Sequence, residues 1–159
     1  MHAGLSSRIA AAILILSPLA NAFAASGTAS FNVSVQVLAA CSISASNMNF
    51  GGITTGTTSM TDATSSLTVN CPNGTPYTIG LSNGANYSST RRMAWGASHI
   101  AYQLYLDNAR TSEWTTSSTL TGAGNGADQT FTVFGRIQAG QAISYTGSYS
   151  DTIVATITY

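Results

Sequence analysis

Few side chains in this sequence could perform acid–base, nucleophilic or metal chemistry, and they are spread along the chain. Among the 159 residues, two histidines and two cysteines are too few for a dedicated zinc cluster. A hydrolase needs a nucleophile, a base and a group that orients the base. His99 is the one usual base beyond the N-terminal stretch, and no G-x-S-x-G turn lies near it. We therefore predict no catalytic residue, no cofactor and no metal site. The carboxylates, which give no positive sign of a paired glycosidase site, are Asp62, Asp107, Glu113, Asp128 and Asp151.

The charge balance argues against nucleic acid as a partner. Charged residues make up 6% of the sequence, the formal net charge is zero, and the five basic residues are all arginines. Such a chain cannot neutralise a row of phosphates. The 44% hydrophobic content also argues against disorder, which needs low hydrophobicity and high net charge. The glycine-rich stretch 122–126 lacks the lysine of a phosphate loop and indicates a turn.

The first residues have the pattern of a signal peptide, which we place at residues 1–24. Arg8 supplies a basic start, residues 9–19 form an apolar run, and Ala22-Phe23-Ala24 offers the small residues of a peptidase site. We predict cleavage after Ala24, with Ala20-Asn21-Ala22 as a second candidate site. The apolar run is shorter than the roughly 20 residues that a membrane-spanning helix needs. The chain is therefore expected to be exported and soluble.

Export gives the two cysteines a specific meaning. In an oxidising compartment an even pair such as Cys41 and Cys71 is most simply a disulfide. Closing that loop would stabilise the fold by roughly 3.5 kcal/mol on a chain-entropy estimate. A free-thiol function is the alternative.

The elements that would carry these residues are β-strands. Apolar residues alternate with polar ones in short blocks bounded by Gly, Asn, Ser and Thr, which is typical of an all-β fold. Residues 67–71 and 77–81, with Pro72-Asn73-Gly74 between them, predict a hairpin-like pair. The later blocks are 100–106, 131–137 and 147–159. Short strands at this spacing predict an immunoglobulin-like sandwich.

The N-terminal alternation is too long for such a domain. From Ala29 to Ala45 the odd-numbered residues are almost all apolar, and a strand of that length would extend roughly 56 Å. A domain of this size is only roughly 35 to 40 Å across. Either the strand bends at Ala39-Ala40, or its first half leaves the domain and pairs with another polypeptide. The residues in that first half are Phe31, Val33, Val35 and Val37.

The C-terminal alternation points to a vacancy in the same domain. It continues through the last residue, so the chain ends inside a strand, and the blocks after residue 38 predict about six strands where a complete sandwich has seven. A missing strand leaves an open edge and an apolar groove. If each copy lends its N-terminal strand to the next, the head-to-tail contact builds a filament. We therefore expect an incomplete immunoglobulin-like sandwich, completed by a donor strand from a neighbour.

Several motifs resemble, in order and over nearly the whole mature chain, the spore coat protein U domain family, which includes subunits of archaic (Csu-type) chaperone-usher pili. They are Cys41-Ser-Ile-Ser, Met48-Asn-Phe-Gly51, Leu67-Thr-Val-Asn-Cys71, Gly74-Thr-Pro-Tyr77, Arg92-Met93, Tyr102-Gln-Leu-Tyr105, Phe134-Gly-Arg136 and Tyr149-Ser-Asp-Thr152.

The resemblance implies a route of assembly for the chain. Such subunits bind a periplasmic chaperone that lends a strand, pass through an outer-membrane usher, and polymerise with copies of themselves or other pilus subunits. It implies a cell-surface pilus for adhesion and biofilm formation. A single domain favours a shaft or adaptor subunit over the tip.

The resemblance also assigns roles to residues. Residues 25–37 would be the donor-strand extension, with Phe31, Val33, Val35 and Val37 as its donor side chains, and 38–159 the pilin-like domain. Cys41 and Cys71 would form the disulfide. The final strand, 152–159, would border the acceptor groove through Ile153, Ala155, Ile157 and Tyr159.

Two other functions remain open at this point. A secreted spore-coat or matrix protein would carry the same domain. A carbohydrate-binding β-sandwich would use exposed aromatic residues as stacking platforms, and Trp114 lies in a Thr- and Ser-rich segment that resembles a surface loop. Trp95 is the second candidate, although both tryptophans could instead pack in the core.

Overall fold

The computed structural model describes residues 24–159, in two compact units, 24–36 and 37–159. The predicted signal peptide, apart from Ala24, lies outside the described residues. Residues 24–41 contain no strand. Within the described range no helix has the length and apolar character needed to cross a membrane.

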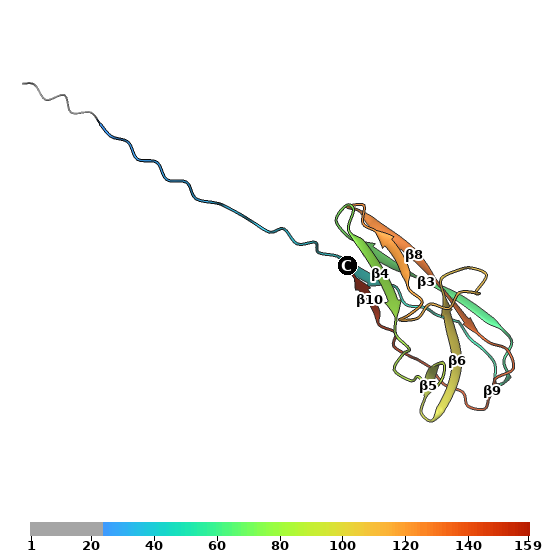
Figure 1. Ribbon diagram of the computed structural model, residues 1–159. Helices are drawn as coiled ribbons and strands as arrows, with labels where there is room; N and C mark the ends of the chain where they lie inside the picture. Colours follow the sequence, from blue (N-terminus) through green and yellow to red (C-terminus); the bar gives the residue numbers. More distant parts are fainter. Residues whose placement is uncertain (1–23) are drawn as a thin grey trace, which may run out of the picture. The chain divides into compact units, whose positions relative to one another are not determined.

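The second unit is built entirely from strands in three sheets (Figure 1). The larger sheet has the order β1-β3-β8-β6-β5, the smaller has β10-β4-β7, and β2 pairs with β9. All ladders are antiparallel. The strands are β1 (Ser42–Ala45), β2 (Gly56–Thr57), β3 (Thr61–Asn70), β4 (Pro76–Leu81), β5 (Arg91–Trp95), β6 (Ser98–Tyr105), β7 (Leu120–Ala123), β8 (Asp128–Ile137), β9 (Ala142–Ile143) and β10 (Ala155–Thr158).

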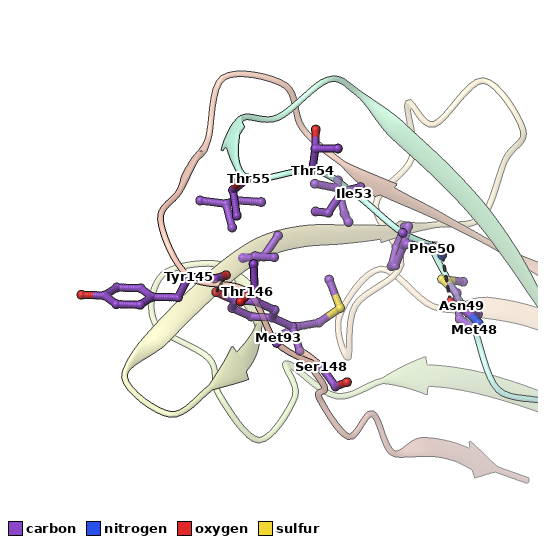
Figure 2. Close-up of a pocket in the computed structure, with 17 residues that line it drawn as sticks. Met48, Asn49, Phe50, Ile53, Thr54, Thr55, Met93, Tyr145, Thr146 and Ser148 are labelled. Carbon is purple, nitrogen blue, oxygen red and sulfur yellow. Dashed lines mark hydrogen bonds between the residues drawn. The ribbon is translucent and has the colours of Figure 1, made fainter.

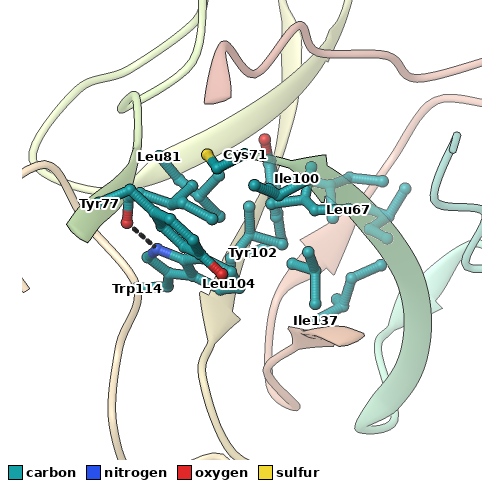
Figure 3. Close-up of a cluster of buried hydrophobic side chains, with 13 residues drawn as sticks. Leu67, Cys71, Tyr77, Leu81, Ile100, Tyr102, Leu104, Trp114 and Ile137 are labelled. Carbon is teal, nitrogen blue, oxygen red and sulfur yellow. Dashed lines mark hydrogen bonds between the residues drawn. The ribbon is translucent and has the colours of Figure 1, made fainter. Parts of the chain in front are cut away.

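The core lies between the two larger sheets and is made by the alternating residues. Figure 3 shows side chains of β3, β4 and β6 meeting there, together with Trp114. Since successive side chains of a strand point to opposite faces, each alternating block contributes one inward row. The predicted inward rows are the observed ones: Leu67, Val69, Cys71, Tyr77, Ile79, Leu81, Ile100, Tyr102 and Leu104 are all at most 5% exposed.

The predicted hairpin between residues 67–71 and 77–81 is wrong. The turn is present, since the N–H of Thr75 donates to the carbonyl of Pro72 at 3.1 Å. However, β3 pairs with β1 and β8, whereas β4 pairs with β10 and β7. The segment 71–75 therefore crosses from one sheet to the other, and the two inward rows face each other across the core.

The strand count and the terminal strands also differ from the prediction. The described residues form ten strands rather than six, because short pairings such as β2 with β9 leave no alternating block in the sequence. The N-terminal alternation forms a strand only at 42–45, and the last strand covers 155–158 instead of 152–159. Burial nevertheless alternates from residue 151 to 158. The all-β, immunoglobulin-like class is as predicted.

Candidate functional site

Two adjoining cavities form one groove along the domain of residues 37–159. One has a volume of about 510 Å³ and the other about 520 Å³. They share a lining of Met48, Asn49, Phe50, Met93 and Tyr149, so they are continuous. The first cavity reaches Ile153 and Ala155 near β10, and the second reaches Ile143 in β9. The groove thus runs from the edge of the smaller sheet toward the β5–β6 hairpin.

The floor of the groove is the hydrophobic core itself. Core side chains from both sheets line the bottom of the groove but are themselves at most 6% exposed. The open apolar surface belongs to the partly buried residues around them, among them Met48, Phe50 and Ile153. Burial of such surface is worth roughly 25 cal/mol per Å². The floor residues are Leu67, Leu81, Ile100, Tyr102, Leu104, Val133, Ile137 and Ile143.

One wall of the groove is the segment 45–55, which has no strand after Ala45. Figure 2 shows Met48, Phe50 and Ile53 of this wall turned toward the cavity. The wall rests on Gly135 of β8, where an added Cβ would lie 2.9 Å from the ring of Phe50 and would also meet Met48. Gly135 therefore sets how deep this wall sits. The ring of Phe50 also packs edge-on against Tyr102, with centroids 6.1 Å apart.

Asp151 fixes the opposite wall, which runs from residue 145 to 155. Its Oδ1 accepts hydrogen bonds from the backbone N–H of Ala85 at 2.9 Å and of Asn86 at 3.2 Å, and from Nδ2 of Asn86 at 3.1 Å. The hydroxyl of Tyr102 donates to Oδ2 at 2.7 Å. Burial, and then the bond to Asp151, raise the pKa of Tyr102 far above its usual range. The phenol therefore stays neutral and acts as a donor.

Arg91 ties together the elements behind this wall. It is 2% exposed. Its Nε donates to the carbonyl of Ser82 at 2.9 Å, and Nη2 donates to those of Leu81 at 3.2 Å and Trp114 at 2.7 Å. Burial lowers the pKa of Arg91, while the charge of Glu113, 3.5 Å away, opposes the shift. Arg91, in β5, therefore joins this strand by hydrogen bonds to the end of β4 and to the segment before β7.

Strand β10 offers an unpaired edge beside the groove. It lies at the end of the order β10-β4-β7, and no strand of residues 24–159 pairs with its other side. The N–H of Ser82 donates to the carbonyl of Val154, and Ala155 is opposite Leu81. Because ladder bonds alternate along an antiparallel strand, the backbone groups of residues 153, 155 and 157 point to the open side. The groove therefore presents both apolar surface and hydrogen-bonding backbone.

The predicted acceptor residues fall at different places along this edge. Ile153 and Ala155 line the groove, and Ile157 packs partly buried against the core beyond it. Tyr159 is 57% exposed. The sequence did not identify the wall residues Met48 and Phe50 as part of a site, although they stand in a motif that carried the family resemblance.

The predicted donor residues are solvent-exposed. Phe31, Val33, Val35 and Val37 are each at least 85% exposed, which is far from the usual state of an apolar row. Cys41 and Cys71 are joined by a disulfide with their Cα atoms 4.4 Å apart. This bond attaches the start of the domain to the end of β3.

The candidates for other chemistry are placed as follows. The sequence around Trp114 suggested a surface position, but Trp114 is fully buried. Its Nε1 donates to the carbonyl of Ile79 at 2.8 Å. Trp95 is 51% exposed. His99 is exposed on β6, and the described residues contain no group of three or more His, Cys, Asp or Glu arranged to hold a metal.

The fold places the chain in a class, the all-β immunoglobulin-like sandwiches, here with an open groove beside the unpaired edge of β10. The comparisons give the family. The model of the Spore Coat Protein U domain matches residues 27–156, and the chain belongs to this family. Protein U of Myxococcus xanthus is 33% identical over 170 residues, covering 94% of this chain and 93% of that protein.

A solved structure supports the fold. One chain from the crystal structure of the CsuC-CsuE chaperone-tip adhesion subunit pre-assembly complex, from archaic chaperone-usher Csu pili of Acinetobacter baumannii, superposes with a TM-score of 0.59 and 20% identity. The match covers 77% of the present chain and 40% of that chain. At 20% identity, this similarity supports a shared fold and nothing beyond it.

Proposed function

We propose that this chain is a structural subunit of an archaic chaperone-usher pilus and that it polymerises by donor-strand exchange. The observation that carries the proposal is the groove, which lies over the core and presents the partly buried apolar side chains of its walls beside the unpaired edge of β10. The same chain carries an exposed apolar row at residues 31–37. A strand from a second copy would supply a partner for the open edge of β10 and an apolar face for the groove.

The energetics favour this pairing. Burying the four apolar donor side chains is worth roughly 6 to 12 kcal/mol before ordering costs, and those costs offset a large share. Backbone hydrogen bonds to residues 153, 155 and 157 would add to the remainder and hold the register. Exchange of one donor for another would keep the apolar floor covered at each stage.

The positions of the domain's ends favour a donor that runs antiparallel to β10. Ser42 pairs with Asn70 and Thr158 with Thr78, so the start of the domain and the end of β10 lie at one end, whereas the β5–β6 hairpin lies at the other. A donor antiparallel to β10 leaves the groove at the hairpin end, and its domain continues from there. A parallel donor would leave at the end where the acceptor's own extension begins, and a linear fibre could not grow.

The partners follow from the exposed groove. We infer that a periplasmic chaperone covers it by strand addition before assembly, and that an outer-membrane usher exchanges the chaperone strand for the next subunit. The resulting fibre would lie on the cell surface, with adhesion and biofilm formation as its role. A secreted spore-coat protein is the second candidate, which the description of the matched family favours. Neighbouring genes for a chaperone and an usher would separate the two.

The decisive experiment places a charge in the donor row. In Val35→Arg, a guanidinium would have to leave water and enter a groove whose lining carboxylate, Asp151, already accepts hydrogen bonds from Ala85, Asn86 and Tyr102, which costs several kcal/mol. The groove of the variant is unchanged. It should therefore bind a chaperone and accept a donor as the parent does, but it should not donate. Mixed with the parent chain, it should cap growing fibres and shorten them in electron micrographs.

The matched control is Gln36→Arg, one residue along on the polar face, which should leave fibre length nearly unchanged. Fibres of normal length from Val35→Arg, or equal losses from both variants, would exclude residues 31–37 as the donor strand.

A further inference from the structure

Two large aromatic side chains are exposed at the hairpin end of the domain: Trp95, which is not in the groove lining, and Tyr145, which belongs to the groove wall. Trp95, at the end of β5, is 51% exposed, and Tyr145 is 67% exposed. The Trp95 indole lies directly against Gly147, where an added Cβ would collide with it. Figure 2 shows the ring of Tyr145 pointing away from the cavity. We call Trp95 and Tyr145 the aromatic end surface.

This surface borders the exit of the groove. Gly147 lines the second cavity, and the indole of Trp95 packs against the same residue. The hydroxyl of Tyr149, also in the lining, donates to the carbonyl of Tyr145 at 3.0 Å. A donor strand that leaves the groove at this end therefore passes beside the aromatic end surface.

The chain between donor and domain is too short to keep the next domain away. Leu38, Ala39 and Ala40 alone separate Val37 from Cys41, which its disulfide holds to the domain. Four residue steps span at most roughly 14 Å. With Val37 seated near the exit, the first anchored residue of the donor's domain lies within that distance. The end of that domain must then stand against the end of its acceptor.

We propose that the aromatic end surface is a second contact between consecutive copies of this chain, covered by the Cys41 end of the donor's domain. The inference rests on the strand exchange proposed above. It adds an interface that the donor strand does not make. The occupant is a second copy, because the short connection brings no other group to this place.

The Cys41 end offers apolar surface for this contact. Leu38 is 74% exposed and Tyr159 is 57% exposed, and Pro72 is exposed in the turn of the same end. Tryptophan and tyrosine are the residues most often found as anchors at protein interfaces. Contact would limit bending at each joint of the fibre.

Tryptophan fluorescence tests the proposal directly, because the chain has two tryptophans and Trp114 is fully buried. The quenchable emission therefore comes from Trp95. The reference state is the Val35→Arg chain with its groove filled by a synthetic peptide of residues 25–37, which fills the groove without bringing a neighbouring domain. There Trp95 should remain accessible to acrylamide. In fibres of the parent chain, the accessible fraction should be lost and the emission should shift to shorter wavelength.

The outcomes separate this inference from the proposed function. If fibres form and Trp95 stays as accessible as in the peptide complex, the second contact does not exist. Protection of Trp95 by added oligosaccharides in such fibres would assign the surface to a carbohydrate ligand instead. If neither the peptide nor a second subunit fills the groove, strand exchange itself is wrong, and the second contact is overturned with it.

A variant pair adds an independent measurement. Trp95→Ala should leave the affinity for the 25–37 peptide unchanged and make fibres dissociate roughly tenfold faster in denaturant, a typical effect for an aromatic anchor. Tyr87→Ala removes an aromatic side chain of similar exposure, 48%, from the loop before β5 and should change neither quantity. Equal dissociation rates for Trp95→Ala and the parent would contradict the proposal.

Discussion

At the scale of single residues, Asp151 holds the groove open by fixing one wall to the loop at 85–86. Asp151→Ala would leave the N–H groups of Ala85 and Asn86 and the hydroxyl of Tyr102 without their acceptor. The Asn86 N–H and the Tyr102 hydroxyl are partly buried, and leaving each without a partner costs about 1 to 3 kcal/mol, whereas the N–H of Ala85 is exposed and can bond to water. We expect the variant to lose about 2 to 4 kcal/mol of unfolding free energy in urea titrations.

Asp128→Ala is the matched control. Its carboxylate, at the exposed start of β8, accepts one side-chain hydrogen bond, from Asn70 at 2.8 Å. This variant should stay within about 0.5 kcal/mol of the parent. A similar loss in both variants would show that the Asp151 contacts do not hold the wall.

A second residue-scale prediction concerns acid stability. The hydrogen bond from Arg136, at 2.7 Å, lowers the pKa of Asp62 below 3.8, assisted by the charges of Arg110 and Arg136. A carboxyl whose pKa is lower in the folded state stabilises the fold at pH values above its unfolded-state pKa. That stabilisation is lost as the pH falls through the folded-state pKa. Asp62→Asn should therefore be less stable than the parent at neutral pH, and the difference should shrink below about pH 4. Urea titrations across that range measure it; a difference independent of pH would contradict the prediction.

At the scale of elements, the alternation in the sequence identified which residues face the core, but not which strands pair. Inward rows of β3 and β4 follow from their period of two, since that period depends on the backbone alone. Whether residues 72–74 close a hairpin or cross between sheets depends on partners far away in the sequence. β3 takes β8 as its neighbour, with Thr61 opposite Ile137. Local pattern carries no information on such a pairing.

The same alternation makes a prediction for the acceptor side of the exchange. Ile153 lines the groove, whereas the neighbouring Val154 is 58% exposed on the other face. Ile153→Arg should leave the donor strand intact and block the groove, so this chain should donate to the parent but not accept. Pull-down of tagged variants with the parent chain, or with the 25–37 peptide, measures the acceptor step.

Val154→Arg is the control and should accept a donor normally, because an arginine there stays in water. If both variants bind the peptide equally well, β10 is not the edge of the acceptor site.

At the scale of the whole molecule, the disulfide between Cys41 and Cys71 attaches the start of the domain to the core. A force that pulls on residues 25–37 is therefore transmitted to the domain through this bond. Cys71→Ser should lower the unfolding free energy by roughly 3.5 kcal/mol, because the unfolded chain gains the freedom of the opened loop. The yield of folded subunit should fall accordingly, as measured by urea titration and recovery of soluble protein.

Cys41→Ser and the double variant provide the control. All three changes should have similar effects, since each removes the same bond. A much larger loss in Cys71→Ser alone would point to packing of the fully buried Cys71 side chain rather than to the cross-link.

The sequence by itself determined the all-β class, the inward rows, the cysteine pair and the apolar alternation of residues 29–45, which is too long for one strand of a compact domain. These are properties of local period and composition, which need no knowledge of partners. Only the tertiary structure decided that β3 and β4 belong to different sheets, that Trp114 is buried, and that segments 45–55 and 145–155 form the walls of one groove. The physical reason is that burial and strand pairing depend on contacts between residues far apart in the chain, and the Ser- and Thr-rich loops around these residues carry no period that would place them.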